Sequence, residues 1–287
     1  MRKPDTELLA ANAILYVKKS YVRSNFIAMP TFLFEHIIFG PVKSRRLGVS
    51  LGINLLPSDK KWCSFNCIYC ECGWTSGGAY LPEGFPAREL VRKELEIRLM
   101  LMKQNEERLD TITFAGNGEP TIHPSFGEII SDTVALRDRL APGADIAVLS
   151  NGTMLDDPSV FRALEKVDLN ILKIDSANPE TVRVLNQPHE DFSLERMIGN
   201  ISRFKGRFVL QTLFVSGTFK GNNIDNTTTE ELGAWLQVVE RLKPQMVMVY
   251  TIARDTPSTG LQKIPAERLR HIARKVRKLG IPVQVSA

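Results

Sequence analysis

The stretch T-I-T-F-A-G-N-G-E-P, residues 111–120, joins a short apolar segment to a glycine-rich turn, and residues 125–140 then follow a helical pattern. β-Branched and aromatic side chains in 111–115 favour a strand, whereas the glycines and Pro120 favour a turn. A strand followed at once by a helix is the repeating unit of a parallel sheet. This stretch therefore predicts an α/β fold.

The same order of strand and helix repeats from residue 47 to the end of the chain. Strand 209–215 (V-L-Q-T-L-F-V) is apolar almost throughout, as expected when helices or a barrel interior cover both faces. Asp157 before Pro158 marks a helix start, and Gly280 before Pro282 marks a helix end. The pattern predicts a partial (βα)6 barrel of the TIM type. The expected strands are 47–56, 111–115, 145–150, 169–175, 207–215 and 246–252, with a closing edge strand at 282–286, and the expected helices are 87–103, 125–140, 158–166, 194–204, 229–242 and 265–279.

Residues 1–35 stand outside this alternation and are expected to form a short N-terminal helical extension to a barrel domain of residues 36–287. The apolar run 8–17 carries Asn12 at its centre and lacks a small-residue cleavage site, which favours an amphipathic helix over a signal peptide. No segment has the ~20 apolar residues that a membrane-spanning helix needs. The extension is expected either to cover one end of the incomplete barrel or to dock a partner.

The composition of the chain bounds its class. Its 287 residues, 43% of them hydrophobic, are enough for a large core and one main domain. Lysine and arginine number 37 against 32 acidic residues, and we expect this mild excess of +5 to be spread through many helices. It permits nucleic-acid binding without indicating it. All four cysteines lie between residues 63 and 72, which is typical of a metal site in a reducing compartment, here the cytoplasm.

Three of these cysteines, in the segment C-S-F-N-C-I-Y-C, have the spacing Cys63-x3-Cys67-x2-Cys70. A structural zinc site needs four donors, whereas three thiolates on an iron–sulfur cluster leave one iron open to a substrate or cofactor. A zinc site or a closed electron-transfer cluster would need Cys72 as its fourth ligand. Cys72 is otherwise a spectator thiol, a hydrogen donor to a substrate, or a sensor of cluster loss.

Polar residues follow the predicted strands at the point where each strand ends. Because the carboxyl ends of parallel strands meet at one edge, we expect these residues to converge on the cysteine loop. Lys173 and Asp175 share one face of a strand and form either cofactor or substrate contacts or an internal ion pair. Ser150 and Asn151 suit contacts to ribose or carboxylate, or belong to an Asn-Gly turn.

Two of these segments resemble motifs of a known family. The cysteine triplet, with Tyr69 before its last member, resembles the cluster motif of the radical S-adenosylmethionine (radical SAM) superfamily. The turn G-N-G-E-P at 116–120 is similar to the Gly-Gly-Glu-Pro motif of that superfamily, with Asn117 as a departure. The resemblance covers about residues 36–287. It implies a 4Fe-4S cluster whose open iron binds S-adenosylmethionine, which is then cleaved to a 5′-deoxyadenosyl radical.

The resemblance also implies which residues hold the cofactors. The three thiolates of the triplet would hold the cluster. Gly116 and Gly118 would let the backbone approach the methionine moiety, Glu119 would accept a hydrogen bond from its ammonium group, and Tyr69 would contact adenine. Because the reagent is the radical of the cofactor, no catalytic side chain is predicted. The implied metal ligands are Cys63, Cys67 and Cys70, and the implied S-adenosylmethionine contacts are Tyr69, Gly116, Gly118, Glu119, Ser150, Asn151, Lys173 and Asp175.

A narrower resemblance concerns residues 39–57, which are similar to an uncharacterised subgroup often grouped with wyosine-type tRNA-modifying enzymes. Those enzymes carry a second cluster on additional cysteines, and this chain has only Cys72 to spare. We therefore expect an iron–sulfur oxidoreductase that abstracts hydrogen from an unidentified RNA, peptide or small molecule, with a flavodoxin- or ferredoxin-like reductant and no membrane partner. The alternatives are tRNA-base modification and an electron-transfer module without radical chemistry.

Overall fold

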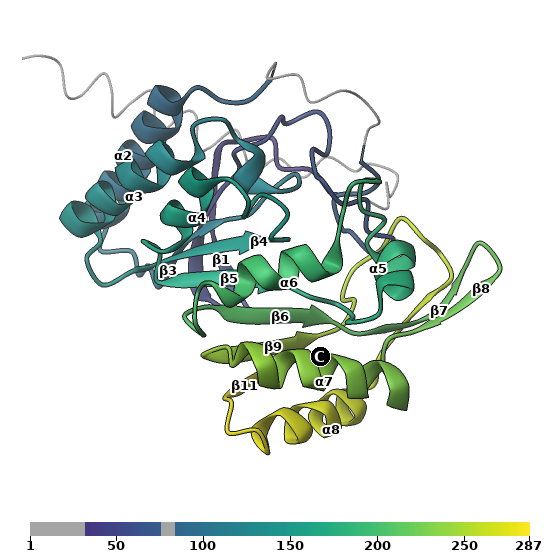
Figure 1. Ribbon diagram of the computed structural model, residues 1–287. Helices are drawn as coiled ribbons and strands as arrows, with labels where there is room; N and C mark the ends of the chain where they lie inside the picture. The colour runs from purple at the N-terminus through teal and green to yellow at the C-terminus, as the bar shows by residue number, and fades with distance from the viewer. Residues whose placement is uncertain (1–31, 76–83) are drawn as a thin grey trace, which may run out of the picture.

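The computed structural model describes residues 32–75 and 84–287. Over these residues one sheet runs in the order β1-β2-β3-β4-β5-β6-β9-β11, and its strands are parallel except for the antiparallel pair of β1 with β2. The sheet curls without closing, and helices cover its outer side (Figure 1). The predicted partial barrel is therefore confirmed. The strands of this sheet are β1 Ile38–Ser44, β2 Gly48–Ile53, β3 Thr111–Phe114, β4 Asp145–Ser150, β5 Leu169–Lys173, β6 Val209–Leu213, β9 Met246–Tyr250 and β11 Val283–Ser286.

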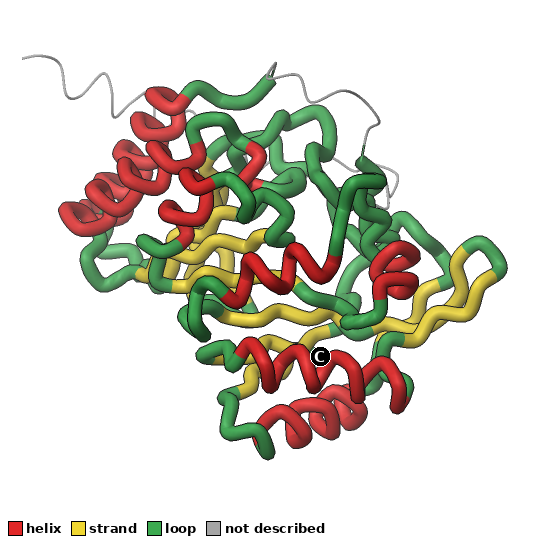
Figure 2. Tube along the Cα trace, viewed as in Figure 1, coloured by secondary structure: helices red, strands yellow, loops and turns green. Residues whose placement is uncertain are grey.

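The helices connect successive strands and lie along the outer side of the sheet (Figure 2). The predicted cap at Asp157 is confirmed, because its side chain accepts a hydrogen bond from the amide of Ser159, and Asn178 caps a helix in the same way by accepting from Glu180 N. The helices are α2 Arg88–Gln104, the short 3-10 helix η1 Pro120–Ile122, α3 Phe126–Leu140, α4 Pro158–Leu164, α5 Pro179–Leu185, α6 Leu194–Ser202, α7 Thr229–Leu242 and α8 Ala266–Arg277. No helix among the described residues is long and apolar enough to span a lipid bilayer.

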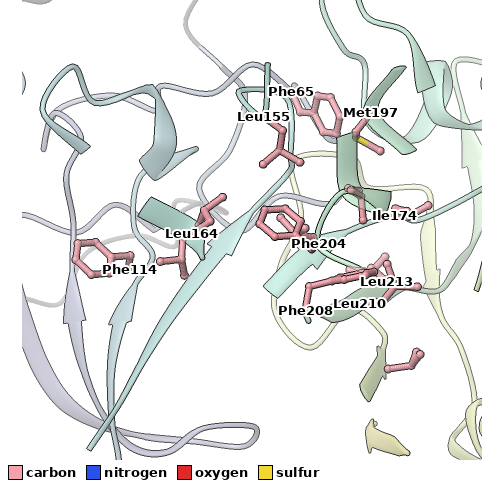
Figure 3. Packing of buried hydrophobic residues seen from close by; sticks show 14 of the residues in the cluster. Phe65, Phe114, Leu155, Leu164, Ile174, Met197, Phe204, Phe208, Leu210 and Leu213 are labelled. Carbon is pink, nitrogen blue, oxygen red and sulfur yellow. The ribbon is translucent and has the colours of Figure 1, made fainter. Parts of the chain in front are cut away.

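Two hydrophobic layers pack against the sheet. The larger lies between the strands and the helices, and Figure 3 shows part of it, including Phe204, Phe208 and Leu210. Phe65, from the cysteine loop, belongs to this same cluster, so the loop is anchored in the core by an aromatic side chain. A small separate cluster consists of Ala147, Ile171, Val209 and Met248, which come from four neighbouring strands.

Some elements were not predicted from the sequence. No strand was expected where β1 lies, and no helix was expected where α5 lies, between the predicted strand 169–175 and the predicted helix 194–204. A second sheet, in the order β10-β7-β8, extends beyond the carboxyl ends of the main strands (Figure 1). Its strands are β7 Val215–Phe219, β8 Asn222–Asp225 and β10 Leu261–Lys263.

The predicted N-terminal helix at 8–17 lies outside the described residues. The first described segment, 32–34, hydrogen-bonds to the barrel: Phe32 N donates to Glu71 O (2.8 Å), and Phe34 N donates to the side chain of Asn117 (2.8 Å). The end of the proposed extension is thus attached to the loops at the carboxyl edge of the sheet. The domain boundary at residue 35 stays a prediction.

Candidate functional site

The segment that follows the carboxyl end of β2 and precedes α2 carries the four cysteines, and we call it the cysteine loop. It crosses the edge of the sheet. Cys67 is buried and Cys63 and Cys70 are half-buried, and all three are free thiols. The segments that follow β3 and β4 contact this loop, so the predicted convergence of strand ends on the cysteine loop is observed. The end of α5 also contacts the loop.

One side of the loop pairs with the glycine-rich turn after β3. Trp62 N donates to Asn117 O (2.8 Å), and Glu119 N donates to Trp62 O (2.9 Å). Gly118 has φ +141°, and a Cβ on it would lie 1.7 Å from Trp62 O; a Cβ on Gly116 would lie 2.3 Å from an oxygen of the Asn54 side chain. The sequence predicted that these glycines leave room for a ligand, and that stays a prediction. The protein gives a further reason for each glycine: a Cβ on Gly118 would overlap the backbone of the cysteine loop, and a Cβ on Gly116 would overlap the side chain of Asn54.

Asn117, the departure from the family motif, is fully buried. Its Nδ2 donates to Phe34 O (2.9 Å) and to Pro57 O (2.8 Å), and its Oδ1 accepts from Phe34 N. The side chain that replaces a glycine therefore fastens segment 32–34 and the start of the cysteine loop to the turn.

The other side of the loop pairs with the C-terminal end of α5. Asn66 N donates to Asn186 O (2.8 Å), Ile68 N donates to Leu185 O (3.0 Å), and Phe65 forms a bridge with Pro188. The cysteine loop is thus held between two backbone pairings. The second pairing was missed from the sequence, because α5 is only two turns long.

Glu119 joins the ends of β3 and β4 below the loop. Its buried carboxylate accepts hydrogen bonds from Ser150 Oγ (2.8 Å), from Asn151 N (2.6 Å) and from the backbone and hydroxyl of Thr121 (3.1 and 2.5 Å). Asn151 continues the network, since its Nδ2 donates to Ser64 Oγ (2.8 Å). Burial raises the pKa of Glu119, although these donors oppose the rise. One oxygen of Glu119 accepts three hydrogen bonds and the other accepts one.

Amide groups donate to two of the three cysteine sulfurs. Asn151 Nδ2 lies 3.6 Å from Cys63 Sγ, and Asn186 Nδ2 lies 3.4 Å from Cys67 Sγ. Hydrogen bonds of this kind are how proteins orient thiolate ligands and tune the potential of a bound cluster. Asn186 was not predicted from the sequence, where it stands in a stretch assigned to loop.

Lys61 is a buried cation of the cysteine loop. It is only 2% exposed, and its Nζ donates to Gly73 O (3.0 Å). Burial alone lowers the pKa of a lysine, but the three thiols, with Cys70 first among them, bring the pKa of Lys61 above its ordinary value. A buried ammonium group of this kind favours negative charge on the neighbouring sulfurs.

The fourth thiol, Cys72, lies beside the third. Its Sγ donates to Gly116 O (3.3 Å), and a hydrogen bond between Cys72 and Cys70 is the main cause that lowers the pKa of Cys70 to about 5. Among the described residues, no group of three or more His, Cys, Asp or Glu side chains is arranged to hold a single metal ion. A cluster of several iron atoms is larger, so its thiolates do not have to meet at one point.

Lys173 and Asp175 form the internal ion pair that the sequence left as an alternative to cofactor contacts. Lys173 Nζ lies 3.1 Å from Asp175 Oδ1 and donates to Tyr250 Oη (3.0 Å). Asp175 also accepts from Leu213 N (2.9 Å), from Asn186 Nδ2 (2.7 Å) and from the hydroxyl of Tyr69. The side chain of Asp175 is 0% exposed and that of Lys173 is 14% exposed, so Lys173 is the accessible member.

The implied cofactor residues therefore fall into two groups on either side of the cysteine loop. Glu119, Ser150 and Asn151 reach Cys63, whereas Tyr69, Lys173 and Asp175 reach Cys67 through the amide of Asn186. Asn151 links the first group to Cys63, and Asn186 links the second group to Cys67.

Comparisons with known proteins show the family to which the chain belongs. A family model described as the Radical SAM superfamily matches residues 60–232. A UPF0026 protein of Methanocaldococcus jannaschii is 34% identical over 233 residues, which are 80% of this chain and 67% of that protein. A UPF0026 protein of Synechocystis is 27% identical over 275 residues, 86% of this chain and 95% of that protein. A protein of Brachyspira hyodysenteriae named GTPase Obg is 28% identical over 236 residues, and the chain spans 81% of its own length but only 32% of that protein.

Solved structures share the fold at low sequence identity. A radical SAM methyltransferase from Sphaerobacter thermophilus has a TM-score of 0.61 at 15% identity, over 83% of this chain and 65% of that one. SuiB from Streptococcus suis, in a complex with S-adenosylmethionine, has a TM-score of 0.57 at 13% identity, over 82% of this chain and 50% of that one. At these identities the likeness shows the fold alone.

Proposed function

Because this chain belongs to the radical SAM superfamily, whose members use a 4Fe-4S cluster and S-adenosylmethionine, we propose that Cys63, Cys67 and Cys70 hold the cluster and leave one iron open. The observation that supports this assignment is the way in which the protein holds the cysteine loop. Two backbone pairings fix the position of the loop, and side-chain amide groups donate hydrogen bonds to two of its sulfurs. The donor set fits a cluster: three thiols with a buried cation and nitrogen donors around them.

When bound, the cluster and S-adenosylmethionine supply a 5′-deoxyadenosyl radical, formed as one electron breaks a carbon–sulfur bond of the sulfonium. The protein has to bind these groups, align them and keep water away from them. We propose that the backbone of the turn at Gly118 and the oxygen of Glu119 that accepts a single hydrogen bond face the methionine moiety, and that Tyr69 and Lys173 line the adenosine side. These roles rest on the closeness of both groups to the thiols.

The proposed reaction is hydrogen abstraction from a substrate that is not yet identified, in an oxidoreductase of the cytoplasm that receives electrons from a flavodoxin- or ferredoxin-like protein. No side chain is assigned as a general acid or base. The substrate would enter over the same edge of the sheet, because the radical acts within contact distance of the cofactor.

Cys72→Ala tests the proposal against a closed, four-cysteine electron-transfer cluster. If Cys72 is not a ligand, the reconstituted variant keeps about the same iron and sulfide content, and S-adenosylmethionine still changes the electron paramagnetic resonance signal of the reduced cluster. Cys63→Ala is the matched control and should lose the cluster. A Cys72→Ala protein that loses its cluster, or whose signal ignores S-adenosylmethionine, would overturn the three-ligand assignment.

A further inference from the structure

A dense group of positive charges lies on the last helix of this protein. Residues 261–287 contain seven lysine and arginine residues and one glutamate, a net charge of +6, whereas the whole chain carries +5. Residues 1–260 therefore carry a net charge of −1, from 30 basic and 31 acidic residues. The expected spread of the excess through many helices is therefore not uniform, because α8 and the residue that follows it carry a net charge of +5 by themselves.

The fold turns these charges outward. The apolar side of α8 consists of Leu269, Ile272, Ala273 and Val276, which are all buried in the main core. The helix runs along the outer surface of the molecule beside α7 (Figure 1). The basic residues on its other side form what we call the α8 cationic face. Its exposed members are Arg270, Arg274, Lys275, Arg277 and Lys278.

These cations are not neutralised within the protein. Among the described residues, no ion pair joins any member of the α8 cationic face to a carboxylate. The one acidic residue of the helix, Glu267, lies in its first turn, before the cationic face begins. The pKa of His271, within the face, is lowered first by desolvation and then by Lys275 and three neighbouring cations. Positive charge is therefore dense around His271 and toward the end of the helix.

The arrangement of the face matches a phosphate backbone. From residue 270 to residue 278 an α-helix rises about 12 Å, and an equal length of a nucleic-acid duplex carries about seven phosphate charges. Five exposed cations along this length allow several phosphate contacts at once. Such contacts position a nucleic acid through charge and do not read its sequence.

Two other anionic partners fit the face less well. A protein interface is centred on buried aromatic or aliphatic side chains and is poor in lysine, but none of the exposed large hydrophobic residues of the described chain lies on α8. A membrane-surface helix inserts its apolar side into the lipid, but the apolar side of α8 is buried in the core. We propose that the α8 cationic face binds the phosphodiester backbone of a nucleic acid.

Fluorescence anisotropy of the full chain with labelled probes tests this binding surface. The probes are a short single-stranded RNA, an RNA hairpin and a DNA duplex, each titrated at several KCl concentrations. Each phosphate contact contributes about 0.7–0.9 to the slope of log K against log salt, so five contacts predict a slope of about −3.5 to −4.5. Binding of RNA alone, or of both RNA and DNA, supports the proposal and identifies the source of the phosphates. Binding of none of the three probes overturns it.

The variant Arg274→Gln/Lys275→Gln/Lys278→Gln should weaken binding to every probe and make the slope shallower by about two to three. The matched control Arg92→Gln/Lys93→Gln/Lys103→Gln removes the same charge from exposed positions on α2 and should leave the slope unchanged. Thermal melts of both variants check that folding is intact. Equal losses in the two variants, no loss in the α8 variant, or a preference for polyglutamate over the nucleic acids would overturn the assignment.

This binding requires neither the cluster nor S-adenosylmethionine. A Cys63→Ala/Cys67→Ala/Cys70→Ala protein should bind the probes with the same salt dependence as the parent. Failure of the proposed radical chemistry and failure of the α8 cationic face would therefore be seen in separate measurements.

Discussion

Asp175→Asn should destabilise the protein by removing the charge that balances Lys173. The substitution keeps the shape of the side chain, and its oxygen can still accept from Lys173 Nζ and Leu213 N. Its new amide group would face Asn186 Nδ2 and the hydroxyl of Tyr69, where Asp175 now accepts hydrogen bonds. The variant therefore leaves a largely buried ammonium without its counter-charge and puts donors against donors.

The magnitude follows from the burial of this pair. Removing one partner of a buried ion pair costs about 3–5 kcal/mol, because the remaining charge stays desolvated. For a domain of this size about 3–5 kcal/mol corresponds to a fall in Tm of roughly 6–20 °C. Replacing Lys173 by Met in the Asp175→Asn background removes the stranded charge. The double variant should be more stable than Asp175→Asn by at least about 1 kcal/mol.

The pH dependence of this effect has a definite sign. Burial lowers the pKa of Lys173, but Asp175, Tyr250 and Cys67 outweigh it and raise the pKa above the ordinary lysine value. The stabilisation from a raised lysine pKa is complete below the unfolded pKa of about 10.4 and is lost only as pH rises beyond it. In the parent this contribution should therefore stay constant between about pH 6 and pH 9, whereas in Asp175→Asn the burial of Lys173 is less opposed, so the penalty in the variant should shrink as pH rises toward the unfolded pKa.

Urea unfolding of the cluster-free chain, followed by circular dichroism, measures these differences without the linkage that a bound cofactor adds. Glu180→Gln is the control, because its pair with Arg183 is more than two thirds exposed and contributes about 1 kcal/mol or less. The reasoning is refuted if Asp175→Asn lowers the free energy of unfolding by no more than Glu180→Gln does. It is also refuted if the losses in free energy of unfolding from Lys173→Met and Asp175→Asn add up to that of the double variant.

Two further substitutions test how the cysteine loop is held. Gly118→Ala should lower the free energy of unfolding by about 2–6 kcal/mol and prevent cluster assembly, because its Cβ would overlap Trp62 O at a positive φ. Gly199→Ala lies inside α6 with open space around it, so it should instead raise the free energy of unfolding by about 0.5–1 kcal/mol, measured by the same urea unfolding. Asn186→Leu removes the donor to Cys67 Sγ, so the cluster should assemble with a more negative reduction potential in a spectroelectrochemical titration, and an unchanged potential would show that this hydrogen bond has no influence.

Much of the barrel could be predicted because the pattern of apolar residues in each strand and helix reflects which of its sides are buried. Strand Val209–Leu213 is buried on both sides and reads as a continuous apolar run, and helix Thr229–Leu242 agrees with its predicted bounds. β1 was missed because a Gly-Pro pair within it is atypical of a strand. Strand Asn222–Asp225 was missed because it is polar and short, in a sheet outside the barrel.

The candidate site could be predicted only in part, namely where its residues lie close together in the sequence. The thiols and the glycine-rich turn are local patterns, so a single sequence reveals them. The role of Asn186 depends on a contact across 119 positions of the chain, between its amide and Cys67, which no local pattern encodes. The reason for Gly118 was predicted incompletely, because the carbonyl that fills its space belongs to Trp62, 56 positions earlier in the sequence.

The central claim is that three thiolates hold a cluster with one open iron that binds and cleaves S-adenosylmethionine. The most direct measurement is the yield of 5′-deoxyadenosine, by mass spectrometry, after anaerobic reconstitution of the full chain with iron and sulfide and addition of S-adenosylmethionine and a strong reductant. The claim predicts that the parent protein and Cys72→Ala both form 5′-deoxyadenosine, and that Cys63→Ala forms none. A reconstituted parent protein that holds its cluster and yields no 5′-deoxyadenosine would contradict it.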